Sequence, residues 1–300
     1  MFKHLSGIYA AAITPLNEDR SLALRDVVPL LDFLASRGCH GALLLGTTGE
    51  GPSFSPEERV NLLGKAVEIK GIYPDFQLLA GTGTPSLTET KNLTRTALEL
   101  GVDGVVVLPP YYYKGTSEDG LFAWFEYLIG SSVSPSEALF AYHIPALSGI
   151  GISKELLVRL KETFPDRFAG VKDSSGDPQH AQELGEMLGS DLLIMTGNDR
   201  LLSFCLEHAG SGGITALANL CSIGSRRVWD AYQRGEKDQT TQIHLNSARS
   251  VLERYPPAPP LLKALYTRWF DFPHWTLMPP LQELPEEIEA QAASDFKALE

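Results

Sequence analysis

The sequence lacks the features of several large classes of protein. Acidic residues outnumber basic ones, 37 to 25, and the formal net charge of −12 argues against a nucleic-acid or anionic-membrane partner. Its three cysteines, Cys39, Cys205 and Cys221, lie in apolar surroundings and indicate reduced core thiols in a cytoplasmic protein. No apolar run approaches the length of a membrane span, and the first residues do not resemble a signal peptide.

Short motifs of several enzyme classes are missing as well. Gly81-Thr-Gly83 is not followed by the third glycine of a dinucleotide-binding motif, and there is no phosphate-binding Gly-Lys-Ser/Thr sequence. A serine-hydrolase Gly-x-Ser-x-Gly elbow is absent. The seven histidines are scattered and form no His-x-x-x-His pair, so we predict that the protein has no metal site.

A short apolar run followed by an amphipathic stretch recurs eight times. The runs are often β-branched, as in strands buried on both faces, and cover Gly7–Pro15, Gly41–Gly46, Phe76–Thr82, Gly104–Pro109, Ala138–Pro145, Phe168–Lys172, Leu192–Gly197 and Gly212–Ala216. Helix-start signals follow some of them, at Ser55, Ser86 and Asp177. Eight such units predict an α/β fold of the (β/α)8 TIM-barrel type, because a doubly wound sheet usually has fewer strands.

The strand pattern stops near residue 222. The remaining stretches Val228–Gly235, Gln239–Arg254, Leu261–Phe270 and Pro285–Leu299 have helical spacing, and a proline-rich segment, Tyr255–Pro260, separates two of them. We therefore predict a barrel over residues 1–222 and a C-terminal helical extension, residues 223–300, packed on it.

Lys172 ends an apolar strand, which is an unusual place for a charged side chain. Burying an ammonium group is costly unless it is paired or loses its proton. At the carboxyl end of a barrel strand, where active sites lie, a neutral lysine amine can attack a carbonyl to form a Schiff base. A surface lysine just past the strand is the alternative, and this stretch alone does not decide between them.

Other strand ends also carry polar residues. The loop Gly46-Thr-Thr-Gly-Glu-Gly51 offers two hydroxyls and backbone N–H groups for a carboxylate, or is simply a tight turn. The tyrosines of Pro109–Tyr113 favour packing or an interface over catalysis. On the fifth strand, alternation places Tyr142 and His143 on opposite faces, so that His143 faces the helices if Tyr142 faces the barrel interior.

Together these segments resemble the pyruvate-dependent class I aldolases of the dihydrodipicolinate synthase and N-acetylneuraminate lyase superfamily. The matching segments occur in order along the chain and are Gly46-Thr-Thr-Gly-Glu50, Pro110-Tyr-Tyr112, Tyr142-His-Ile-Pro145, Gly170-Val-Lys-Asp173 and Gly212-Gly-Ile214. The resemblance implies a barrel enzyme that needs no cofactor, because the substrate forms a covalent imine with Lys172. It also implies a homotetramer, a dimer of dimers.

The resemblance implies a role for each matching residue. Lys172 would form the Schiff base, Tyr142 would move protons, and Thr47 would hold Tyr142. Tyr112 would join that relay and reach into a neighbouring subunit's site. Thr48 and Gly49 would bind the substrate carboxylate, and the main chain of Ile214 would line the pocket beside the imine.

Three further positions bear on the substrate. Leu147 stands where the synthase branch has an arginine for aspartate semialdehyde, and Arg200 replaces an acidic residue of the neuraminate lyase branch. Asp199 offers a polar group for sugar hydroxyls, and Arg200 is the nearest candidate for a second anionic group. We therefore expect an aldolase that cleaves a 2-keto-3-deoxy sugar acid or a related 2-oxo acid. A dihydrodipicolinate synthase, an N-acetylneuraminate lyase, a dehydratase using the same imine and a non-catalytic metabolite-binding protein remain alternatives.

Overall fold

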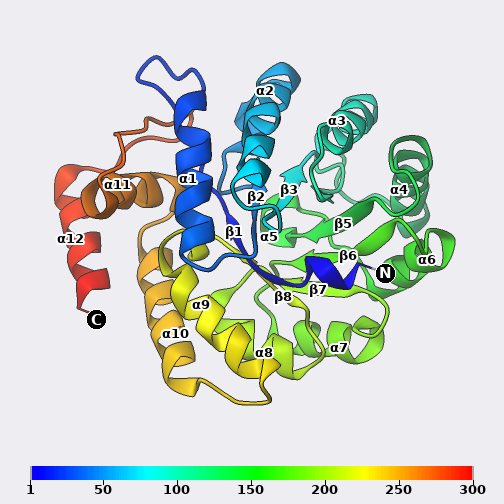
Figure 1. The fold of residues 1–300 in the computed structure, drawn as a ribbon. Coiled ribbons are helices and arrows are strands. Elements are labelled where there is room, and N and C mark those ends of the chain that lie inside the picture. Colours follow the sequence, from blue (N-terminus) through cyan, green and yellow to red (C-terminus); the bar gives the residue numbers. More distant parts are fainter. Residues whose placement is uncertain (1, 299–300) are drawn as a thin grey trace.

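The chain forms a closed barrel of parallel strands in a computed structural model, which describes residues 2–298 (Figure 1). The eight strands of this part of the chain are β1 (Gly7–Ala11), β2 (Gly41–Leu44), β3 (Gln77–Gly81), β4 (Gly104–Val107), β5 (Ala138–His143), β6 (Phe168–Asp173), β7 (Leu193–Thr196) and β8 (Gly212–Thr215). Each strand pairs with the next, and β1 closes the barrel against β8. The predicted TIM barrel is confirmed.

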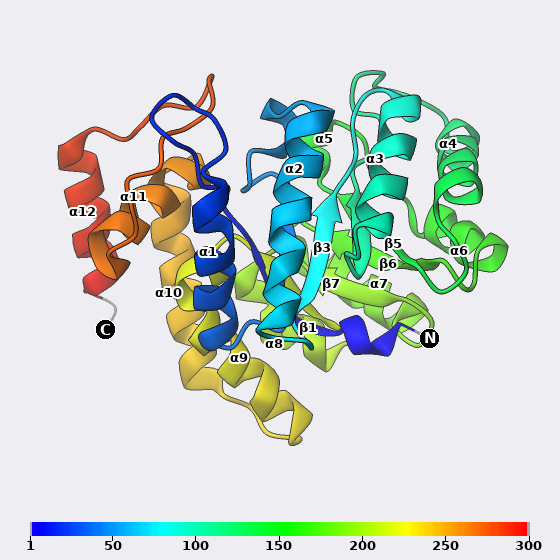
Figure 2. The same cartoon turned by 45° about the horizontal axis from the view of Figure 1, so that its top comes forward.

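Helices alternate with the strands and surround the barrel (Figures 1 and 2). They are α1 (Leu24–Ser36), α2 (Pro56–Ala66), α3 (Leu87–Glu99), α4 (Glu118–Ser132), α5 (Pro145–Ser148), α6 (Lys154–Thr163), α7 (Pro178–Leu188), α8 (Leu202–Glu207) and α9 (Ala218–Gln233). The predicted start signals work as expected. Ser55 and Glu58 form a reciprocal capping box at α2, and the side chains of Ser86 and Asp177 accept hydrogen bonds from the first turns of α3 and α7.

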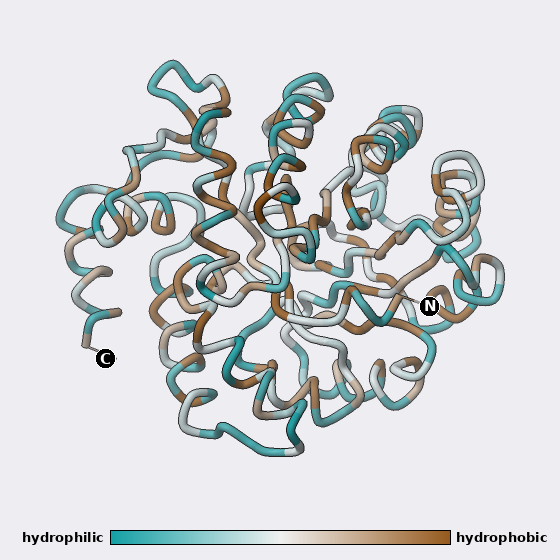
Figure 3. The backbone as a smooth tube through the Cα atoms, in the orientation of Figure 1, coloured by the Kyte–Doolittle hydropathy of each residue, from teal (hydrophilic) through white to brown (hydrophobic). Residues whose placement is uncertain are grey.

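Two layers of apolar side chains hold the barrel together. One fills its interior, with members that include Tyr9, Leu43, Phe140, Met195 and Ile214. The other lies between the strands and the helices. Both faces of each strand are therefore buried, which explains the continuous apolar runs in the sequence. Within the turns of the helices, hydrophobic and hydrophilic residues alternate, as expected for segments with one face on the barrel (Figure 3).

Glycines allow neighbouring strands to approach closely at several places, of which two bear on the site and on barrel closure. A Cβ atom on Gly170 would lie 2.0 Å from the carbonyl oxygen of Leu193 on β7. A Cβ atom on Gly212 would lie 1.9 Å from the carbonyl oxygen of Gly7, where the barrel closes. We infer that Gly170 is required by the packing of β6 on β7 more than by space for the lysine side chain two residues on.

The C-terminal helices lie together on one side of the barrel, beside α1 and α9 (Figures 1 and 2). They are α10 (Gln239–Arg254), α11 (Ala258–Phe270) and α12 (Glu286–Lys297). The last predicted helix extends to Leu299, which lies outside the described residues. Helix α9 starts at Ala218, ten residues before the stretch Val228–Gly235 that the sequence predicted. The division of the chain at residue 222 stays a prediction.

Within residues 2–298, the structure contains no helix with the length and apolar character needed to cross a membrane.

Candidate active site

Lys172 and Tyr142 are direct neighbours on adjacent strands. They are partners in the parallel register of β5 and β6, and the Lys172 ammonium lies 4.2 Å from the centre of the Tyr142 ring. Tyr142 belongs to the side chains that fill the barrel interior, and Lys172 is only 3% exposed. The alternative of a surface lysine is therefore excluded.

The hydroxyl of Tyr142 lies in a strongly polar environment. Burial alone raises its pKa, but the charge of Lys172 and hydrogen bonds with Thr47, Lys172 and Ser174 outweigh this effect. As a result, the pKa of Tyr142 lies below the usual value of about 10. A phenol with a lowered pKa next to an amine can accept and return a proton, which is the property a proton relay needs.

The loop after β2 is fixed by unusual backbone geometry. Leu45 and Glu50 have positive φ angles, 57° and 55°, on either side of Gly46–Gly49. A Cβ atom on Gly49 would lie 2.7 Å from the carbonyl oxygen of Ala12, so only glycine fits there. The loop brings Thr47 to Tyr142, and the next residue, Thr48, is buried.

Two predicted site residues lie on the surface of the single chain. The Tyr112 side chain is 73% exposed and stacks edge to face on Tyr113. Leu147 lies on α5, directly after β5, and is 64% exposed. Both residues follow strands at their carboxyl ends, but neither is buried with Lys172. The relay role of Tyr112 stays a prediction and requires a partner subunit.

The end of β7 is engaged by α10. Asp199 is buried, accepts a hydrogen bond of 2.5 Å from Thr215 and contacts Arg249 of α10 at 3.2 Å. Burial raises the pKa of Asp199, although Arg249 and Thr215 oppose the shift. Arg200 pairs with Glu253 of α10 at 2.5 Å. Both side chains thus have partners within the protein. The predicted contacts of Asp199 and Arg200 with substrate stay predictions.

Ile214 lies on β8 among the side chains of the barrel interior and is fully buried. The structure thus brings Lys172, Tyr142 and Ile214 together inside the barrel, with Thr47 in contact with Tyr142.

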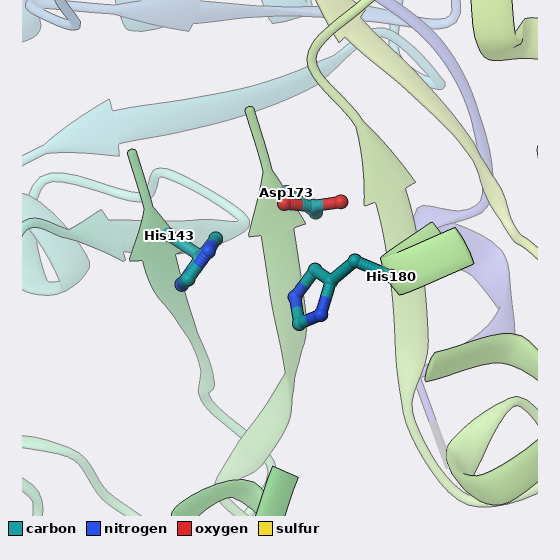
Figure 4. A group of neighbouring side chains, drawn as sticks. All are labelled: His143, Asp173 and His180. Carbon is teal, nitrogen blue, oxygen red and sulfur yellow. The ribbon is translucent and has the colours of Figure 1, made fainter. Parts of the chain in front are cut away.

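The next residues along β5 and β6, His143 and Asp173, and His180 of α7 point toward one another (Figure 4). One potential ligand atom from each lies within 4.8 Å of the others. The Nδ1 of His143 accepts the N–H of Ile152, so its Nε2 carries the proton in the neutral ring. Burial lowers the pKa of His143, which favours that neutral form. His143 therefore offers a proton, and not a lone pair, to the group. The expectation of activity without a metal stays a prediction.

The family model described as "Dihydrodipicolinate synthetase family" matches residues 4–299. The chain belongs to this family.

Its relatives within the dihydrodipicolinate synthetase family carry different names. A protein of Chloroflexus aurantiacus named "Uncharacterized DapA-like lyase" is 37% identical over 96% of this chain and 95% of its own length. A 4-hydroxy-tetrahydrodipicolinate synthase of Corynebacterium urealyticum is 32% identical over 80% of this chain and 77% of its own. The crystal structure of dihydrodipicolinate synthase from Agrobacterium tumefaciens superposes with a TM-score of 0.87, at 30% identity, over 98% of this chain and 99% of that one.

The sequence alone did not identify two parts of the site. Ser174, which hydrogen-bonds to Tyr142, follows Lys172 by two residues, and its place at the strand end was the available signal. The partners of Glu50 were the other omission. They lie in the C-terminal region, at Lys263 and Met278, and no local pattern connects them with the loop.

Proposed function

We propose that this protein is a class I aldolase that cleaves a 2-keto-3-deoxy sugar acid, or a related 2-oxo acid, to pyruvate and an aldehyde. The observation that carries the proposal is the buried pair of Lys172 and Tyr142, held side by side at the carboxyl ends of β5 and β6. Membership of the dihydrodipicolinate synthetase family supports it, because named relatives are lyases and synthases.

The reaction begins with attack of the Lys172 amine on the C2 carbonyl, and loss of water gives an imine. The protonated imine withdraws electrons from the C3–C4 bond. Tyr142 takes the proton of the C4 hydroxyl as this bond breaks, which releases the aldehyde and leaves an enamine. Protonation of the enamine at C3 gives the pyruvate imine, and water then releases pyruvate and the free lysine. The lowered pKa of Tyr142 suits it to move these protons.

The loop after β2 supplies the third element. Thr48 and the backbone around Gly49 bind the substrate carboxylate, while Thr47 orients the Tyr142 hydroxyl. These groups fix the 2-oxo acid with its carbonyl at Lys172. No cofactor takes part, because the covalent imine provides the electron sink. The protein acts as a cytoplasmic homotetramer in which Tyr112, exposed on the single chain, meets the site of a neighbouring subunit.

Trapping with pyruvate and borohydride tests the imine. We expect irreversible inactivation and addition of the reduced pyruvate mass to the peptide that contains Lys172. The same treatment without pyruvate is the control. Modification of another residue, or of none, would contradict the Schiff-base mechanism.

The second candidate is a synthase that condenses pyruvate with aspartate semialdehyde. Two relatives that are 32% and 30% identical to this chain are named 4-hydroxy-tetrahydrodipicolinate synthase. Leu147 counts against it, since leucine offers no hydrogen-bond donor to the semialdehyde carboxylate. We expect kcat/KM for cleavage of the preferred member of a panel of 2-keto-3-deoxy acids to exceed that for the condensation by about tenfold or more. A condensation faster by that factor would replace the aldolase assignment with the synthase.

A further inference from the structure

A buried ion pair joins the loop after β2 to the C-terminal helices. Glu50 Oε1 lies 2.5 Å from the Nζ of Lys263 on α11, and the two side chains are 0% and 2% exposed. The other carboxylate oxygen, Oε2, accepts the N–H of Met278 at 2.8 Å. Lys263 Nζ also donates to the carbonyl oxygen of Thr276 at 2.7 Å. One side chain of the loop is thus bound both to α11 and to the segment that follows it.

A buried ion pair adds little to the free energy of unfolding. Removing both charges from water is costly, and an apolar pair of the same volume often stabilises a protein as well or better. A buried ion pair does fix geometry, because both charges must meet their partners. The C-terminal partners come from α11 and from residues 276–278, on the side of the barrel where Figure 2 shows α11 beside α1.

The backbone of the loop needs such an anchor. Glu50 has a left-handed φ of 55°, which is unfavourable for a residue with a side chain. Gly51 packs so closely on Leu45 that an added Cβ atom would lie 1.9 Å from its carbonyl oxygen. The carbonyl oxygen of Gly49, in the same peptide unit as the Glu50 nitrogen, accepts the Thr14 hydroxyl at 2.7 Å. Thr14 therefore fixes the backbone at this end of the loop, and the Glu50 side chain ties the same end to α11 and the segment after it.

We propose that Glu50 and Lys263 are positioning residues, through which α11 sets the geometry of the carboxylate-binding loop Thr47–Gly49. The proposal rests on the proposed function, since it assigns the loop to the carboxylate of a 2-oxo acid. Lys172 pairs with Tyr142 on β5 and with Met195 on β7, and we expect its amine to keep its place when the Glu50–Lys263 pair is broken. Loss of the anchor then weakens recognition of the carboxylate and leaves imine formation possible.

Glu50→Asp is the sharpest variant, because it keeps the charge but shortens the link by one methylene group. We expect the pyruvate concentration for half-maximal borohydride trapping to rise by about tenfold, as for a misplaced hydrogen-bonding site. For methyl pyruvate, which lacks the carboxylate charge, the concentration for half-maximal trapping should change by less than about threefold in the same variant. If Glu50 had a purely structural role, the half-maximal trapping concentrations of both ligands would rise by the same factor.

Two further variants complete the test. Lys263→Met removes the cation and should weaken pyruvate trapping as Glu50→Asp does, if it folds. The double variant Glu50→Gln with Lys263→Met leaves no buried unpaired charge, so we expect it to fold even if the single variant does not. The control is Lys154→Met, which breaks the ion pair of the same length between Lys154 and Glu183, a pair that is 27% and 39% exposed. We expect the double variant to lose pyruvate affinity as Glu50→Asp does, and the control to match the wild type.

Hydrogen–deuterium exchange separates this proposal from the proposed function. Amides of residues 45–54 should exchange faster in Glu50→Asp and in the double variant than in the wild type, and at the wild-type rate in Lys154→Met. If pyruvate does not trap the wild type, the aldolase proposal fails while the exchange still tests the anchor. Unchanged exchange, or faster exchange with unchanged preference for pyruvate over methyl pyruvate, would overturn the positioning role.

Discussion

The ends of β6 and β7 both carry charged side chains, but their partners differ. Lys172 on β6 lies beside Tyr142, whose hydroxyl also meets Thr47 and Ser174 from two strand-end loops. Asp199, after β7, is bound by Arg249 of α10 and by Thr215. Lys172 thus has its partner on a neighbouring strand, whereas Asp199 is bound by an outer helix as well as by the end of β8. In the proposed function the first arrangement carries the chemistry, and the second attaches α10 to the barrel.

Tyr142→Phe tests the catalytic side of this comparison and should have the largest effect. Removal of a proton relay lowers kcat by about 10²–10⁴-fold, while the Lys172 amine still traps pyruvate with borohydride. Because the pKa of Tyr142 lies below its usual value, the wild-type rate should rise with pH to a plateau reached below about pH 10. If the variant turned over at the wild-type rate, or if its rate rose with pH as the wild-type rate does, Tyr142 would have no part in the mechanism.

Arg249→Met tests the attachment side. It leaves the buried carboxylate of Asp199 without its cation, so the free energy of unfolding should fall by about 3 kcal/mol. In chemical denaturation the loss should diminish at low pH, since a protonated Asp199 needs no cation. The kcat/KM value of the folded variant should stay within about threefold of the wild type. A large drop in kcat/KM at unchanged stability would instead place Asp199 in the substrate site.

Arg200→Ala should have the smallest effect. The pair of Arg200 with Glu253 is more than a third exposed on both sides, and such pairs contribute about 0–1 kcal/mol. We expect little change in thermal stability and in kcat/KM for the preferred substrate. A rise in KM of about tenfold, confined to substrates with a second anionic group, would assign Arg200 a binding role after all.

Local patterns predicted the fold and the central residues of the site. The apolar runs mark the strands because both strand faces are buried, and the period of two places Tyr142 and Lys172 inward and His143 outward. The start of α9 was missed because Cys221 has non-helical backbone angles, which divide the segment. Ser174 was missed because its one signal, a position directly after a strand, is shared by many polar loop residues.

Contacts between distant parts of the chain could not be predicted. Glu50 and Met278 are 228 residues apart, and Asp199 meets Arg249 across 50 residues. Neither pair leaves a periodic signal, because it depends on how α10 and α11 pack on the finished barrel. The exposure of Tyr112 is a similar case, since the surface it covers would belong to another subunit.

The anchoring of Glu50 by α11 has a consequence for biosynthesis. All eight strands, Lys172 and Tyr142 are translated before Lys263, so a growing chain can close its barrel while Glu50 still lacks its cation. The strands and Lys172 would then be in place before the loop after β2 is anchored. A chain released before α11 would resemble the finished enzyme in its barrel and differ from it in the loop after β2.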